Sequence, residues 1–264
     1  MRLCRYERSG QPRVGVVERD DVRDAGSSLF DLDVGDVEGR WDELTLLAPV
    51  ARPQKIVGIG LNYRDHAAET GAALPPQPLL FAKWANTVAG PGEPIVLPVP
   101  TVSSAVDYEA ELGVVIGTRA AGVPVSRALD HVLGYTCLND VSARDRQRAE
   151  PQWIRGKSLD TFCPLGPWIT TADEIPDPQS LGIRLFLNGD TMQDSTTAQM
   201  VFGVAELIAF ISEAITLEPG DIIATGTPPG VGAARTPPVF LKDGDNVTVE
   251  IDSIGRLTNP VVAR

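Results

Sequence analysis

Short apolar runs rich in β-branched residues, separated by polar turns, dominate the pattern along this chain. Most of these runs are five to ten residues long and are bounded by Gly, Pro or Asp, which is typical of β-strands. The pattern predicts strands at residues 13–19, 55–60, 108–117, 136–138, 183–188 and 222–224, and a hairpin over 239–251 that turns at 243–245.

Helical periodicity is convincing in one segment, residues 201–215, where apolar residues recur every three or four positions. Residues 62–70 form a shorter charged segment that predicts one or two helical turns ending at Gly71. Strands therefore outnumber helices, and the expected fold class is a β-rich α+β protein. The apolar stripe of the long helix comprises Val204, Leu207, Ile208, Ile211 and Ile215.

The chain divides into two expected parts. Residues 1–50 contain strand-like pieces and acidic turns and are predicted to form a small N-terminal domain. The segment 49–53 begins and ends with proline, so it predicts a linker. Residues 51–264 then form the main domain, in which we find no internal repeat.

Composition narrows the range of partners. The 264 residues include 23 Lys+Arg and 35 Asp+Glu, a net charge of −12, and no basic stripe that could neutralise phosphates. Nucleic acid and anionic membranes are thus not expected partners. The sequence has no apolar signal region at its start and no apolar stretch of ~20 residues. Its three widely spaced cysteines are those of a cytoplasmic protein with reduced thiols: Cys4, Cys137 and Cys163.

Two glutamates on one predicted strand are the first candidates for chemistry. Side chains alternate along a strand, so Glu109 and Glu111 share one face, and Tyr108, Ala110 and Leu112 share the other. Two carboxylates about 6–7 Å apart along a strand can face one cation. The alternative is an edge strand with two solvated glutamates.

Asp140 supplies a third carboxylate, at the point where another predicted strand ends. Three oxygen ligands without His or Cys nearby suit Mg²⁺, Mn²⁺ or Ca²⁺ and not Zn²⁺. The sequence by itself does not show that Glu109, Glu111 and Asp140 converge.

His66 and Glu69 lie three residues apart in the predicted helical turn, so they are neighbours on one face. A carboxylate beside an imidazole raises its basicity, as a general base requires. The alternative is an ordinary surface pair. His131, the other histidine, has no motif around it and is expected to be structural.

Two further segments offer donors to a ligand. Lys157 follows Gly156, at which the backbone can approach a ligand closely. The turn 225–232 exposes backbone N–H groups and the hydroxyls of Thr225 and Thr227, which could hold a carboxylate. A plain structural turn is the alternative, and the turn is not a P-loop because it lacks Gly-Lys-[Ser/Thr].

Six of these segments, in this order, resemble the fumarylacetoacetate hydrolase family over roughly the last four-fifths of the chain. The matching segments are GLNYRDHAAE (60–69), GPGEPIVLP (90–98), VDYEAELGVVIG (106–117), GYTCLNDVSARDRQ (134–147), RGKSLDTFCPLGPWI (155–169) and LEPGDIIATGTPPGVG (217–232).

The resemblance implies a roll of mixed β-sheets with a small N-terminal domain, usually a homodimer, that binds Mg²⁺ or Mn²⁺ and acts on small 2-oxo acids. It implies metal ligands, catalytic residues and substrate contacts. By motif match, the metal ligands fall on Glu109, Glu111 and Asp140, the catalytic residues on His66, Glu69 and Lys157, and the substrate contacts on Arg144, Gln147, Thr225, Gly226 and Thr227.

The reaction that the resemblance favours is hydrolysis of a C–C bond in a 2,4-dioxo acid of the acylpyruvate type. Decarboxylation of an oxaloacetate-type acid and isomerisation or tautomerisation of a 2-oxo-enedioate are alternatives on the same site, and a catalytically silent binding protein is a fourth. Segments 83–87 and 197–200 depart from the family pattern. We expect both to line the pocket and to affect substrate preference.

Overall fold

The computed structural model describes all residues, 1–264, and confirms a β-rich α+β fold built on two sheets. The larger sheet has 12 strands in the order β4-β3-β2-β1-β14-β12-β11-β17-β6-β7, with β5 paired to β1 and β8 to β14. Its strands are β1 (Arg2–Arg8), β2 (Gln11–Glu18), β3 (Asp21–Asp24), β4 (Val37–Arg40), β5 (Leu46–Leu47), β6 (Ile56–Gly60), β7 (Leu79–Lys83), β8 (Val88–Ala89), β11 (Ala110–Ile116), β12 (Val132–Asn139), β14 (Cys163–Thr171) and β17 (Ile222–Ala224).

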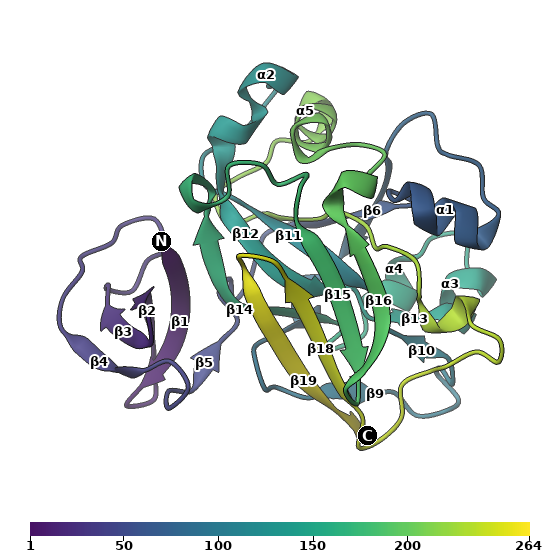
Figure 1. Cartoon of the computed structure of the whole chain (residues 1–264), viewed down its shortest axis with the longest axis horizontal. Helices are drawn as coiled ribbons and strands as arrows, with labels where there is room; N and C mark the ends of the chain where they lie inside the picture. Colours follow the sequence, from purple (N-terminus) through teal and green to yellow (C-terminus); the bar gives the residue numbers. More distant parts are fainter.

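The second sheet has five strands and packs across the first, with a pair of two-residue strands nearby (Figure 1). In the five-stranded sheet, alternate residues are buried, as a half-exposed sheet requires. Its order is β16 (Asp190–Thr196), β15 (Gly182–Leu187), β18 (Asn246–Ile251), β19 (Gly255–Ala263) and β9 (Ile95–Leu97); the separate pair is β10 (Val106–Asp107) and β13 (Ser142–Ala143).

The helices are short and lie at the ends and sides of the sheets (Figure 1). None of them is long and apolar enough to cross a bilayer. The α-helices are α1 (Arg64–Thr70), α2 (Val125–Ala128), α3 (Arg144–Ala149), α4 (Ile154–Lys157) and α5 (Val204–Ala214). The 3₁₀ segments are η1 (Ala85–Thr87), η2 (Leu129–His131), η3 (Ala172–Glu174), η4 (Thr197–Gln199) and η5 (Gly232–Ala234).

The amphipathic helix expected over 201–215 is confirmed as α5. Glu206 accepts a hydrogen bond from Gly203 N at 2.8 Å and so satisfies a free N–H at the helix start. Four of the five predicted stripe residues are buried, but Ile215 is 40% exposed. The prediction was wrong for Ile215 because the helix ends at Ala214 and residue 215 takes an extended conformation that turns it off the stripe.

The hairpin predicted over 239–251 is wrong in its pairing. Strand β18 instead pairs with β19, and the turn between them spans residues 252–254. Residues 239–245 carry no strand, and Leu241 N donates to Val106 O at 2.8 Å. The Asp-Gly-Asp turn is present, but the segment before it, 239–242, runs beside β10 and does not pair with β18.

The N-terminal strands β1–β5 form a lobe at one side of the molecule, drawn in purple in Figure 1. Backbone pairing continues from this lobe into the main sheet, since Arg2 and Leu3 pair with Thr170 and Ile169 of β14. Leu3 also joins a buried apolar cluster with residues of β14 and β17. The largest cluster, of 37 residues, lies between the two sheets and under α5.

The strand predicted over 108–117 is confirmed as β11, which lies at the centre of the large sheet and is buried along its whole length. Ala110, Leu112 and Val114 point into the main core, as the alternation predicted. The opposite face of the strand start carries Glu109 and Glu111. Antiparallel pairing of Ala110 with Asn139 places Asp140 opposite Glu109, and Asp140 N donates to Glu109 O at 2.9 Å.

Candidate active site

Three carboxylates converge where β11 begins and β12 ends. One oxygen of each of Glu109, Glu111 and Asp140 lies within 4.8 Å of the others. All three residues are at most 5% exposed. The alternative of two solvated glutamates on an edge strand is therefore excluded. The pairing of β11 with β12 is what brings Asp140 beside two residues about thirty positions earlier in the chain.

Two buried lysines neutralise part of this negative charge. Lys157, at the end of α4, places Nζ 2.7 Å from Glu109 Oε2 and 2.6 Å from Asp140 Oδ2. Lys83, at the end of β7, places Nζ 2.6 Å from Asp140 Oδ1 and also donates to the Lys157 carbonyl. Lys83 thus holds both a carboxylate of the cluster and the backbone of the lysine opposite it.

Arg144 is the third cation and is held by a buried aspartate. Its Nε donates to Asp107 Oδ2 at 2.8 Å, and its Nη1 donates to Gln147 Oε1 at 3.0 Å. Its Nη2 forms an ion pair with Glu109 Oε1 at 2.6 Å. Asp107 also accepts from three backbone N–H groups, including those of Gly232 and Ala233.

The pKa values of the two glutamates move in opposite directions. Burial alone would raise the pKa of Glu109, but the charges of Arg144 and Lys157 outweigh it and lower the pKa to about 2. Burial, together with the charges of Asp140 and Glu109, raises the pKa of Glu111 well above its usual range. Glu111 makes no ion pair, and its one hydrogen-bond partner is Gly226 N, which donates to Oε2 at 2.8 Å.

Glu111 has no cation of its own. The site contains four buried carboxylates and three buried cations, and every ion pair among them involves the other carboxylates. The carboxylates are Asp107, Glu109, Glu111 and Asp140, and the cations are Lys83, Arg144 and Lys157. A buried carboxylate without a cation is costly, and a divalent ion beside it removes the cost. The cluster offers oxygen atoms only, which suits Mg²⁺ or Mn²⁺. The residues present therefore fit a divalent metal ion held by Glu109, Glu111 and Asp140.

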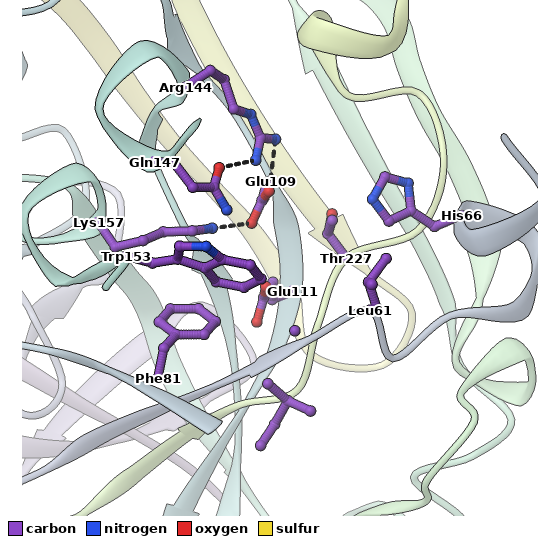
Figure 2. Close-up of a pocket in the computed structure, with 12 residues that line it drawn as sticks. Leu61, His66, Phe81, Glu109, Glu111, Arg144, Gln147, Trp153, Lys157 and Thr227 are labelled. Atoms are coloured by element: carbon purple, nitrogen blue, oxygen red, sulfur yellow. Dashed lines mark hydrogen bonds and ion pairs between the residues drawn. The ribbon is translucent and has the colours of Figure 1, made fainter. Parts of the chain in front are cut away.

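The cluster opens into a cavity of about 80 Å³, here called the inner chamber. Figure 2 shows Glu109 between Arg144 and Lys157 on one side, with His66 on the opposite side and Thr227 between them. Phe81 and Trp153 close another wall, their ring centroids 5.6 Å apart. Lys157 Nζ lies 5.0 Å from the Phe81 ring centroid, so this cation faces a carboxylate and an aromatic ring together.

A larger cavity of about 460 Å³, here called the outer chamber, adjoins the inner one. The two share five lining residues, and the outer chamber adds apolar side chains and one further cation, Arg148. The Arg148 side chain is exposed and makes no hydrogen bond or ion pair within the protein. No Asp or Glu lines this chamber. The shared residues are Leu61, His66, Arg144, Gln147 and Trp153.

His66 and Glu69 form the pair that their spacing predicted, on helix α1. His66 Nδ1 lies 2.9 Å from Glu69 Oε2, and Glu69 Oε1 accepts from Gly230 N at 2.8 Å. The imidazole is 12% exposed and lines both chambers. Glu69 therefore joins the histidine to the 225–232 turn, which an ordinary surface pair does not do. Helix α1 ends at Gly71, as expected, with a left-handed φ of 67°.

The two threonines of the 225–232 turn point in different directions. Thr225 Oγ1 donates to Leu112 O at 2.9 Å, and Thr225 does not line either chamber. Gly226 likewise faces Glu111 through its N–H and not a chamber. Thr227 lines the inner chamber. Of the three residues predicted to contact substrate in this turn, the structure brings only Thr227 to the cavity.

The expectation for the two departing segments was wrong, because neither 83–87 nor 197–200 contributes a residue to the lining of either chamber. Lys83 nevertheless affects the site indirectly, through its ion pair with Asp140. The sequence signal that could have identified Lys83 is its position at the end of an apolar strand. Asp107, next to the predicted strand, offered a similar signal. Gln193, whose amide reaches Thr227 from the second sheet, offered none.

The remaining candidates lie apart from the site. His131 Nδ1 contacts Thr118 Oγ1 at 3.1 Å, in keeping with a structural role. All three cysteines are buried and unpaired. Burial raises the pKa of each thiol, so none of them is a reactive thiolate.

Comparison with known proteins identifies relatives of this architecture and site. The mitochondrial oxaloacetate tautomerase of Xenopus laevis is 52% identical over 221 residues, which cover 83% of this chain and 69% of that protein. The fumarylacetoacetate hydrolase of Exiguobacterium antarcticum is 39% identical over the full length of both chains, with a TM-score of 0.92. A 5-carboxymethyl-2-hydroxymuconate delta-isomerase of Mycobacterium smegmatis is 38% identical, also at full coverage, with a TM-score of 0.87.

The family described as fumarylacetoacetate hydrolase C-terminal matches residues 55–262, which include every residue assigned above to the two chambers. The resemblance that the six sequence segments indicated is thereby confirmed. The chain belongs to the fumarylacetoacetate hydrolase family.

Proposed function

We propose that this protein is a metal-dependent tautomerase that interconverts the enol and keto forms of a small 2-oxo diacid of the oxaloacetate type. The observation that carries the proposal is that His66, held by Glu69, lines the same inner chamber as Glu109 and Glu111. The name of the Xenopus laevis relative supports this choice among the reactions of the family.

The metal would be Mg²⁺ or Mn²⁺, held by Glu109, Glu111 and Asp140. When bound, it supplies a Lewis acid that favours negative charge on the 2-oxo oxygen of the substrate. The protein's own contribution is to keep these three ligands apart and oriented, through Lys83 on Asp140, Lys157 on Glu109 and Asp140, and the N–H of Gly226 on Glu111.

Lys157 and Thr227 would hold the 2-oxo acid head of the substrate. Burial opposes the charged form of Lys157, but the charges of Asp140 and Glu109 raise its pKa above the ordinary value, so it remains a cation at neutral pH. Its N–H groups would donate to the oxygen on which charge develops. Thr227 Oγ1 would donate to the substrate carboxylate, and Arg144 with Gln147 would face its other end.

His66 would move the proton at C3. In ketonisation the enol hydroxyl gives its proton to water as the C2=O bond forms, and the electron pair of the C2–C3 double bond takes a proton from the imidazolium to form C3–H. The imidazole then regains a proton from water. In the reverse direction the neutral imidazole removes a proton from C3. Glu69 would hold the ring in place and stabilise its charged form, while its second oxygen stays fixed by Gly230 N.

Hydrolysis of a C–C bond in an acylpyruvate-type acid is the second candidate, because the outer chamber has room for an acyl group beyond C4. Here His66 would take a proton from water, the hydroxyl would add to the C4 carbonyl, and the C3–C4 bond would break with C3 taking up a proton. The name of a relative supports it: the maleylpyruvate hydrolase of Sphingobium is 34% identical at full coverage, with a TM-score of 0.82.

Assays of purified protein with Mg²⁺ or Mn²⁺ separate these candidates. Enol oxaloacetate should lose its ultraviolet absorbance faster with protein than with metal alone. Acetylpyruvate should release pyruvate if the second candidate holds, and pyruvate formed from oxaloacetate reports decarboxylation. No turnover of oxaloacetate, acetylpyruvate or a 2-oxo-enedioate, with either metal, would reject catalysis and favour a silent binding protein.

We also propose that the protein is a homodimer, as expected from the family. Exposed apolar side chains support it: Trp84 is 58% exposed, and Val99 and Val102 are 44% and 39% exposed. Light scattering should give twice the 28.2 kDa mass of the chain. A monomer mass at micromolar concentration would reject the dimer.

A further inference from the structure

Gln193 reaches the site from the second sheet. It lies on β16 and is 1% exposed, so its amide is surrounded by protein. The amide stands between two parts of the site that are far apart in sequence: the backbone of Ala110, which separates Glu109 from Glu111, and the turn that carries Thr227.

The partners of this amide fix its orientation. Ala110 N can only donate, and it lies 2.8 Å from Gln193 Oε1. The carbonyl of Pro228 can only accept, and it lies 2.8 Å from Nε2. The oxygen must therefore face β11 and the nitrogen must face the turn, since the flipped amide would place two donors together and two acceptors together.

This orientation decides the direction of the Thr227 hydroxyl. Gln193 Nε2 has two hydrogens; one goes to Pro228 O and the other to Thr227 Oγ1, 2.8 Å away. Thr227 Oγ1 is then an acceptor within the protein and keeps its own hydrogen free. Because Thr227 lines the inner chamber, that hydrogen is available to an anionic oxygen there.

Thr225 provides the contrast. Its hydroxyl hydrogen is used within the protein, since Oγ1 donates to the Leu112 carbonyl at 2.9 Å. The same turn thus holds one threonine whose hydrogen is consumed by a backbone carbonyl and one whose hydrogen is left for a ligand.

We propose that Gln193 is a positioning residue that makes Thr227 a hydrogen-bond donor to the carboxylate of a 2-oxo acid, an inference that rests on the proposed function. Gln193 does not touch the substrate. It acts through Thr227, and its second bond, to Ala110 N, sets the distance between this donor and the strand that carries Glu109 and Glu111.

The test is binding of oxalate, which resembles the head of an enolised 2-oxo acid, in the presence of Mn²⁺. Gln193→Glu keeps the acceptor for Ala110 N but replaces Nε2 by oxygen. Whether that carboxyl is ionised or has its proton turned to Pro228 O, Thr227 then meets an acceptor and turns its hydrogen away from the chamber. Calorimetry should show oxalate affinity about 10-fold or more weaker, with Mn²⁺ affinity within about 2-fold of wild type.

Three further variants show whether the effect passes through Thr227. Thr227→Val should weaken oxalate binding to a similar extent, and the double variant Gln193→Glu/Thr227→Val should be no weaker than Thr227→Val. Gln179→Glu is the matched control, because that amide also donates to a backbone carbonyl, Thr197 O at 3.1 Å, but lies outside both chambers. It should leave oxalate affinity unchanged.

Oxalate affinity within 2-fold of wild type in Gln193→Glu, or full additivity in the double variant, would overturn this inference while leaving the proposed function intact. Should Gln193→Glu fail to fold, the same cycle with Gln193→Met, which removes the donor without adding a charge, gives the same decision. Wild-type protein that neither binds oxalate nor turns over oxaloacetate would overturn the proposed function, and this inference with it.

Discussion

The two chambers of the site differ in how their polar groups are satisfied. In the inner chamber, of about 80 Å³, nearly every charged group is buried and paired: Lys157 with Glu109 and Asp140, Arg144 with Asp107 and Glu109. In the outer chamber, of about 460 Å³, the lining is more apolar and exposed. Its added cation, Arg148, has no partner within the protein.

This difference suggests different roles for the two chambers: the inner one for the reaction and the outer one for the choice of substrate. A paired, buried set of charges is preorganised and admits one kind of ligand head, because any misfit leaves a desolvated charge behind. An open chamber with a free arginine tolerates many ligand tails and costs little to change. We therefore expect substitutions of the paired charges in the inner chamber to abolish the reaction, and substitutions of residues found only in the outer chamber to alter substrate preference.

The largest effect is expected from the carboxylates proposed to bind the metal. Glu109→Ala and Asp140→Ala each remove a ligand and leave Lys157 facing one carboxylate fewer. Both should lose Mn²⁺ binding by calorimetry and at least about 1,000-fold in turnover, as should wild-type protein treated with a chelator. Asp130→Ala, an exposed pair partner of Arg127, is the control. Activity that survives without metal would contradict the account.

His66→Ala is expected to separate binding from proton transfer. The imidazole lines the chamber but makes no hydrogen bond or ion pair with Glu109, Glu111 or Asp140, so Mn²⁺ affinity should stay within about 2-fold. If His66 is the general acid–base that we propose, its removal should lower kcat by about 10²–10⁴-fold. His131→Ala, which changes the other histidine far from both chambers, should leave kcat unchanged. Loss of Mn²⁺ binding in His66→Ala would show that the histidine is part of the metal site.

The variants Thr227→Val and Thr225→Val test which of the two threonines contacts the substrate. Thr227→Val removes the proposed donor to the substrate, so KM for oxaloacetate should rise about 10-fold. It also leaves one hydrogen of Gln193 Nε2 unpaired, which should cost about 1 kcal/mol of the free energy of unfolding. Thr225→Val removes the bond to Leu112 O, which should cost about 1 kcal/mol of the free energy of unfolding and leave KM unchanged. The reverse pattern would assign the substrate contact to Thr225.

Arg148→Met should have the smallest effect. KM for a 2-oxo acid with a second carboxylate at the far end of a longer chain should rise up to about 5-fold, the scale of an exposed ion pair. KM for oxaloacetate, which we propose binds in the inner chamber, should not change. An equal rise in KM for both substrates would mean that the two chambers act as one.

Much of the fold and of the candidate site could be predicted from the sequence, because the signals are local. The alternation in 106–117 placed Glu109 and Glu111 on one face, and the i, i+3 spacing placed His66 beside Glu69. The stripe of α5 was also evident, although its end at Ala214 was not, since helix ends depend on capping and not on periodicity.

The features that the sequence could not supply depend on contacts between distant segments. Asp140 reaches Glu109 only through the register of β12 on β11. The different roles of Thr225 and Thr227 depend on which neighbour, Leu112 O or Gln193, meets each hydroxyl. The prediction of a hairpin at 243–245 was wrong for the same reason. The turn is present, but residues 246–251 pair with β19, which follows them in the chain, and not with the residues that precede the turn.

The central claim is that His66 moves a proton at C3 of a 2-oxo acid held in the inner chamber. It is tested most directly by proton NMR of oxaloacetate in D₂O with Mg²⁺, following the loss of the C3 hydrogen signal. Wild-type protein should exchange C3 hydrogens faster than Mg²⁺ alone, and His66→Ala should fall back to the rate of the metal alone. Wild type that is no faster than Mg²⁺, or His66→Ala that is as fast as wild type, would contradict the claim.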